Sequence, residues 1–187
     1  MDIFFEAGDI IKEICDINEL GLACKFSALI YFHKYFLIIG CFKSREDFII
    51  ACASCVVIST KTCNQLRQLN EDSKFNKNLK KILAARKVVL FDRVLDVRFI
   101  NKNSNELKEY SFALNERIFY YEFDIMSNIG FDLNPDLPFK YIDQMSAYFK
   151  KFMPMFEQKL TQIALSFMDN FLLLDYSKLG LYKWVHS

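Results

Sequence analysis

Apolar residues recur at helical spacings through most of the chain up to Ile129, and the most uniform stretch is Phe48–Thr60. These thirteen residues carry no charge and run directly into Lys61. Their apolar positions follow helical periodicity, and the consecutive small residues from Ala51 to Cys55 let neighbouring helices approach from several sides. The pattern predicts the central helix of a bundle, with a lysine as the first polar group to emerge from the core.

Four other helices are expected in this part of the chain. Their apolar residues lie three or four apart, and several of these stretches end at a glycine or a polar segment. The expected helices span 5–17, 26–39, 79–95 and 107–129, with a polar stretch at 70–78 and a loop at 101–105. Ser44 is a candidate N-cap of the central helix, since Glu46 and Asp47 follow it in the first turn. No segment alternates long enough to indicate a sheet, so the predicted fold class is all-α.

The last third of the chain holds all three prolines. Two further helices are expected there, at 139–152 and at about 155–176, and both follow prolines, which suit helix starts. We therefore expect a five-helix bundle over residues 1–133, and a linker helix with a partial second helical repeat over 134–187.

The net charge of +1 argues against a general nucleic-acid or membrane-surface binder, because affinity for such partners depends on clustered cations. Basic residues gather locally between Lys74 and Arg98, which we interpret as a solvated face, with contact to an acidic partner as the alternative. No transmembrane segment is expected, since the stretch 26–42 is interrupted by His33 and Lys34.

Six cysteines lie in apolar, helix-like segments, and the N-terminus shows no secretion signal. Reduced thiols in an intracellular compartment are the simplest explanation. Cys52 and Cys55 form a C-x-x-C pair, but it lies inside an uncharged helix, without a second pair at zinc-site spacing or a nearby histidine. We therefore expect neither a metal nor a cofactor.

Glu122 is out of place in the last helix of the bundle. It follows Ile118 by four residues and precedes Ile125 by three, so a carboxylate adjoins the apolar stripe. A buried carboxylate needs a partner, and Lys61 is the natural candidate, converging with it at a solvent-accessible edge of the bundle. Taken singly, Lys61 also fits a helix end that complements the dipole, and Glu122 a stripe-edge residue that reaches water.

Three motifs in this order resemble the cyclin box. They are Ile30–Phe36 (IYFHKYF), Ala51–Lys61, and Leu114–Leu133 (LNERIFYYEFDIMSNIGFDL) with its continuation Asn134–Tyr141 (NPDLPFKY). The last resembles the end of the first box in transcription-type cyclins of the T, K and L groups. The similarity covers approximately residues 10–176 and is strongest over 114–141.

The resemblance implies a regulatory subunit without an active site of its own, which binds and activates a cyclin-dependent kinase in the nucleus, in transcription or cell-cycle control. Lys61 and Glu122 match the family's lysine and glutamate that hold backbone groups of the kinase. Glu116 is the competing glutamate, and the spacing to the closing glycine selects Glu122. Met126, Phe131 and Leu133 match apolar positions of the kinase-facing surface.

The chain also departs from the family pattern. Thr62-Cys63-Asn64 stands where the family usually continues with Val-Glu-Glu, and the second repeat is incomplete. These departures favour the alternative of a degenerate cyclin or a cyclin-fold adaptor, similar to general transcription factors of the IIB kind, that binds a partner without activating a kinase. A third possibility, a helical enzyme or carrier of apolar ligands, lacks a glycine-rich phosphate loop or a metal-ligand spacing.

Overall fold

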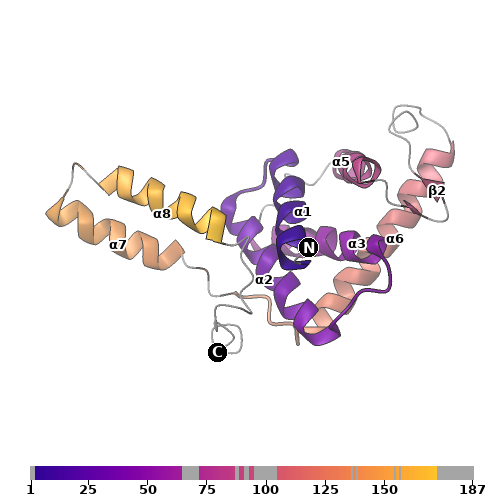
Figure 1. Cartoon of the computed structure of the whole chain (residues 1–187), viewed down its shortest axis with the longest axis horizontal. Helices are drawn as coiled ribbons and strands as arrows, with labels where there is room; N and C mark the ends of the chain where they lie inside the picture. Colours follow the sequence, from indigo (N-terminus) through magenta and orange to yellow (C-terminus); the bar gives the residue numbers. More distant parts are fainter. Residues whose placement is uncertain are drawn as a thin grey trace.

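The computed structural model describes residues 3–64, 72–86, 89–90, 93–94, 105–135, 137, 139–153, 155 and 157–171. Helices dominate these residues, as the all-α prediction requires. They are α1 (Ile3–Ile17), α2 (Leu22–Ile39), α3 (Arg45–Thr62), α5 (Asp72–Ala85), α6 (Asn105–Asn128), α7 (Phe139–Phe152) and α8 (Glu157–Phe171). The first five form a bundle, and α7 and α8 form a hairpin beside it (Figure 1).

Helix α3 is the centre of the bundle, as its uncharged sequence predicts. It packs against α1, α2 and α6, and every residue from Asp47 to Thr60 except Val57 is buried. The small side chains of Ala51, Cys52 and Ala53 have no exposed surface, so neighbouring helices approach closely along this stretch. The Ser54 hydroxyl donates to the carbonyl of Ile118 on α6 at 3.1 Å, a direct bond between the two helices.

Helix α2 is long and apolar enough to cross a membrane by length and composition, alone among the helices in the described part of the chain. The expectation from the sequence was that no such segment exists. However, 56% of this helix is buried inside the bundle, and core helices pass the same test. Its buried Lys25 pairs with Asp16 at 3.1 Å, and its buried His33 lies against the ring of Phe4 at 4.6 Å.

The prediction for residues 70–95 is wrong in two respects. Helix α5 begins at Asp72, inside the expected polar stretch, and ends at Ala85. The reason is that Phe75 is buried together with Leu79 and Ile82, so the apolar side of the helix already includes residues within the polar stretch.

After α5, a short antiparallel ladder replaces the expected helical continuation. It pairs β1 (Val89–Leu90) with β2 (Arg93–Val94), with Val89 opposite Val94. Short runs of valine and leucine satisfy both helix and strand patterns, which explains the error.

The α7–α8 hairpin extends away from the bundle (Figure 1). Helix α7 has the expected bounds, and α8 begins at Glu157, two residues after the expected start; the expected end at 172–176 lies outside the described residues. The two helices pack on each other, and Phe139 at the start of α7 contacts Phe26 of α2 with ring centroids 4.9 Å apart. The proposed division at residue 133 remains a prediction.

Candidate functional site

Lys61 and Glu122 meet at the edge of the bundle. The ammonium of Lys61, in the last turn of α3, donates a hydrogen bond to Oε2 of Glu122 on α6. The Glu122 side chain is only 8% exposed, whereas the Lys61 side chain is 48% exposed. A lysine ammonium has three N–H donors, so this one can hold Glu122 and still bind an acceptor from another molecule.

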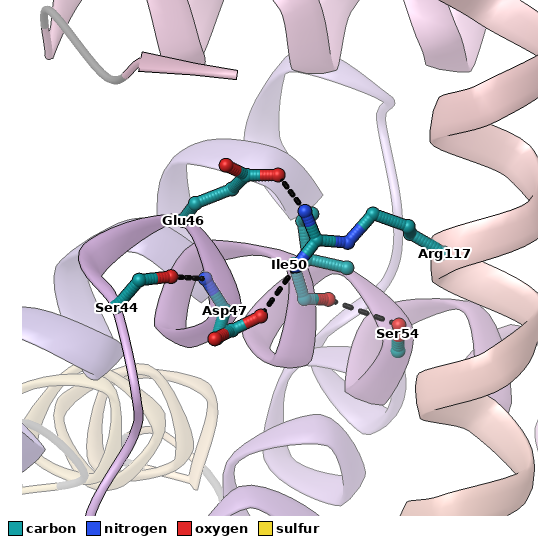
Figure 2. Close-up of polar contacts among 6 residues, drawn as sticks. All are labelled: Ser44, Glu46, Asp47, Ile50, Ser54 and Arg117. Atoms are coloured by element: carbon teal, nitrogen blue, oxygen red, sulfur yellow. Dashed lines mark hydrogen bonds and ion pairs between the residues drawn. The ribbon is translucent and has the colours of Figure 1, made fainter. Parts of the chain in front are cut away.

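A second ion-pair cluster fixes α3 against α6 at the other end of α3 (Figure 2). The Ser44 hydroxyl accepts the backbone N–H of Asp47 at 3.0 Å, which caps the helix. Arg117 of α6 then donates to Glu46 and, at 2.5 Å, to Asp47. Because both ends of α3 are tied to α6, the Lys61–Glu122 pair sits on a rigid support.

The three expected apolar anchors lie around the C-terminal end of α6, in different environments. Met126 and Leu133 are half-buried and pack against the core. Phe131 is 59% exposed, and its backbone has φ of 57°, in the left-handed region that aromatic residues rarely adopt. Gly130 before it has φ of 66°, and the Phe131 N–H donates to the Met126 carbonyl at 2.8 Å. This helix end therefore presents the Phe131 ring to solvent.

Helix α2 holds the same end of α6 in place. Lys34 donates to Asp132 at 2.5 Å, and the Tyr35 hydroxyl donates to Asp124 at 2.5 Å. The Lys34 ammonium lowers the pKa of the Asp132 carboxyl, and burial together with the Asp124 carboxylate raises the pKa of Tyr35.

Tyr31 connects three segments of the site. Its hydroxyl donates to the Leu133 carbonyl at 2.8 Å and lies 3.2 Å from Oγ1 of Thr62. We expect Tyr31→Phe to lower the free energy of unfolding by about 1 kcal/mol, because the Leu133 carbonyl loses its donor. Urea denaturation would measure this, with Tyr120→Phe as the control, since Tyr120 is 64% exposed. Equal stability of the two variants would show that the hydroxyl does not hold Leu133.

The structure distinguishes the two candidate glutamates. Glu122 is buried and pairs with Lys61, while Glu116 lies on the exposed face of α6. On that face the sequence analysis missed an aromatic stripe of Phe112, Phe119 and Phe123, each more than 60% exposed. Their spacings of seven and four residues would have shown that α6 has a second apolar side. Phe119 lies about one turn before Glu122 on α6, and Phe123 follows Glu122 directly in the sequence.

The segment after Lys61 ends the helix. The Thr62 hydroxyl donates to the Ser59 carbonyl at 3.0 Å, and the backbone N–H of Cys63 donates to the same carbonyl at 2.9 Å. Asn64 has φ of 55°, a conformation common for asparagine at helix ends. Thr62 and Cys63 therefore close the helix, Cys63 packs against the core, and residues 62–64 offer no acidic side chain after Lys61.

The thiols of the C-x-x-C pair are closed off from solvent. Cys52 and Cys55 are both fully buried in α3, and burial raises the pKa of each. Within the residues that the structure describes, no group of three or more His, Cys, Asp or Glu side chains is placed to hold a metal ion.

Comparisons with known proteins leave the chain unassigned. No family model, no curated protein and no solved structure matches it. The fold class and the geometry of the site are therefore the basis for any statement about function.

Proposed function

We propose that this chain is a cyclin-like regulatory subunit that binds a cyclin-dependent kinase through the α3–α6 edge and favours its active conformation. The observation that carries the proposal is the Lys61–Glu122 pair, a half-exposed cation and a buried carboxylate on two rigid helices. Phe119 and Phe123 on the same helix and Phe131 just beyond its C-terminal end are exposed and add apolar side chains to this region of α6. A polar centre within an apolar surface is a common organisation of protein interfaces.

The proposed activation mechanism depends on the position of helix αC in the kinase. Phosphoryl transfer requires the ion pair between the strand lysine and the αC glutamate, which forms only when helix αC is turned inward. A partner that binds the inward form better shifts the equilibrium towards it. A shift from 1:99 to 99:1 requires a differential affinity of about 5.5 kcal/mol. In our proposal Lys61 donates to backbone carbonyls of the kinase, Glu122 orients Lys61, and Met126, Phe131 and Leu133 supply apolar contacts.

A panel of purified transcription-type cyclin-dependent kinases tests the proposal. We expect one kinase to bind the chain and to phosphorylate its peptide substrate faster in its presence. Lys61→Ala and Glu122→Ala should each weaken binding by about 30-fold, since a hydrogen bond from a charged donor, correctly oriented, contributes about 2 kcal/mol. Lys12→Ala, on α1, is the matched control. Unchanged binding and rate in both site variants would refute the assignment.

An adaptor that binds without activating is the second candidate. The observation in its favour is the end of α3, where Thr62, Cys63 and Asn64 close the helix and offer no carboxylate to the kinase. The same kinase panel separates the two functions, because an adaptor would bind at similar affinity and leave the phosphoryl-transfer rate unchanged. In both cases the chain itself catalyses no reaction and acts in the nucleus.

A further inference from the structure

Two of the six cysteines meet where α2 packs against the end of α3. Cys24, in the first turn of α2, has no exposed surface, and its thiol donates to the Ser59 carbonyl of α3 at 3.6 Å. Cys63 follows α3 directly, and its backbone N–H donates to the same carbonyl at 2.9 Å. The two cysteines are far apart in sequence, yet a single carbonyl oxygen accepts a hydrogen bond from each.

The two side chains also contact each other. Burial, the charge of Cys63 and a hydrogen bond with Cys63 raise the pKa of Cys24 to about 12. The Cys63 thiol lies 3.7 Å from the hydroxyl of Ser27, which is about one turn after Cys24 on α2. Both cysteines are free thiols in the structure. The α2–α3 contact therefore holds two sulfurs beside each other without a covalent bond between them.

The two thiols differ in their access to solvent. Cys63 is partly exposed, whereas Cys24 is fully buried. An oxidant from solvent therefore meets Cys63 first. Redox-sensing cysteines typically combine an accessible sulfur with a second, resolving cysteine next to it. Disulfides of intracellular proteins are usually transient and of this redox-sensing kind. The arrangement of Cys63 and Cys24 matches both requirements.

We propose that Cys24 and Cys63 are a redox-active pair, which hydrogen peroxide converts into a reversible disulfide between α2 and the end of α3. In the first step the Cys63 thiolate attacks one peroxide oxygen and the O–O bond breaks. Cys63 becomes a sulfenic acid, and the other oxygen leaves as hydroxide, which takes up the thiol proton and becomes water.

The second step closes the disulfide. The Cys24 sulfur attacks the Cys63 sulfur, the S–O bond breaks, and the hydroxyl group leaves with the Cys24 proton as a second water. In total the two thiols lose two electrons and two protons, and the peroxide is reduced to two water molecules. A dithiol reductant reverses the change by thiol–disulfide exchange.

The disulfide would fix the end of α3 to α2 by a covalent bond. Lys61 lies two residues before Cys63, in the last turn of the same helix. Oxidation therefore acts on the part of the bundle that carries the Lys61–Glu122 pair. The redox pair itself consists only of groups at the α2–α3 contact and does not depend on the proposed kinase binding.

Mass spectrometry of the full chain after treatment with hydrogen peroxide and alkylation of the remaining thiols tests the proposal. Trypsin together with a glutamate-specific protease separates Cys24, in fragment 20–25, from Cys15, and places Cys63 in fragment 62–67. We expect these two fragments to be linked, with a mass two hydrogens below their sum. Dithiothreitol should separate them. Because this mapping uses the wild type, it does not depend on the folding of a variant.

Three variants sharpen the test. Cys63→Ser should lose all linkage of Cys24, whereas the matched control Cys41→Ser should keep the link, since Cys41 is exposed in the loop between α2 and α3. Cys24→Ala removes the resolving sulfur, so the sulfenic acid of Cys63 should persist and be trapped by dimedone.

Two results would overturn the proposal. One is that Cys24 and Cys63 stay unlinked at a peroxide dose that oxidises the exposed Cys41. The other is that Cys24 is linked mainly to another cysteine, such as buried Cys15, whose pKa Cys24 helps to raise. Glu122→Ala should form the same disulfide as the wild type, so failure of kinase binding and failure of the redox pair are distinguishable.

Discussion

Arg117→Ala is expected to lower the free energy of unfolding by about 3 kcal/mol. The substitution leaves the carboxylates of Glu46 and Asp47, which are 13% and 12% exposed, without the cation that pairs them. Removing one member of a buried ion pair typically costs about 3–5 kcal/mol, and the partial exposure of Arg117 places the effect at the lower end. Chemical denaturation monitored by circular dichroism would measure it.

Two further variants serve as comparisons for Arg117→Ala. Arg117→Lys keeps the charge but cannot span both carboxylates in the same way, so it should recover only part of the stability. Arg45→Ala removes the partner of Glu6 at the surface, where Arg45 is 59% exposed, and should cost less than about 1 kcal/mol. If Arg117→Ala is no more destabilising than Arg45→Ala, the Arg117 cluster does not hold α3 to α6.

Exchanging the charges of Lys61 and Glu122 is expected to separate the contribution of the pair to stability from its contribution to kinase affinity. Lys61→Glu places two carboxylates together at a site where Glu122 is 8% exposed, so this single variant should lose both stability and kinase affinity. The double variant Lys61→Glu/Glu122→Lys restores an ion pair and should recover stability. It should still bind the kinase about 100-fold more weakly than the wild type, since donor and acceptor have changed places.

The control for this exchange is Glu116→Lys, which alters charge on the exposed face of the same helix. We expect it to change the association rate and its salt dependence more than the dissociation rate. A double variant with wild-type affinity would mean that the pair only supports the bundle, and the proposed donor role of Lys61 would be wrong.

The sequence was informative where a charged residue stood next to or within an apolar stretch. Lys61 ends an uncharged helix and Glu122 interrupts an apolar stripe, and burial of a charge demands a partner, so their meeting was predictable. Arg117 offered no such signal, because a charged residue on a helix is usually exposed to solvent and needs no partner within the protein. Its partners Glu46 and Asp47 lie about 70 residues away in sequence, and only the packing of α6 on α3 brings them together.

Other errors came from patterns that fit more than one structure. The apolar residues near Val89 and Leu90 satisfied a helix template but form a strand, because short apolar runs do not distinguish the two. The stripe of Phe119 and Phe123 was missed because the core-facing apolar residues of α6 already explained the helical periodicity of this segment. A helix with two apolar sides needs tertiary structure to show which side is buried.

The position of α3 at the centre of the bundle determines how the bundle unfolds. Because α1, α2 and α6 each bury part of their apolar surface against α3, none of them can open without exposing part of α3. The bundle should therefore open as a single cooperative unit with slow amide exchange throughout α3. The α7–α8 hairpin has no fully buried side chain among those with described burial. Its amide hydrogens should therefore exchange faster than those of α3.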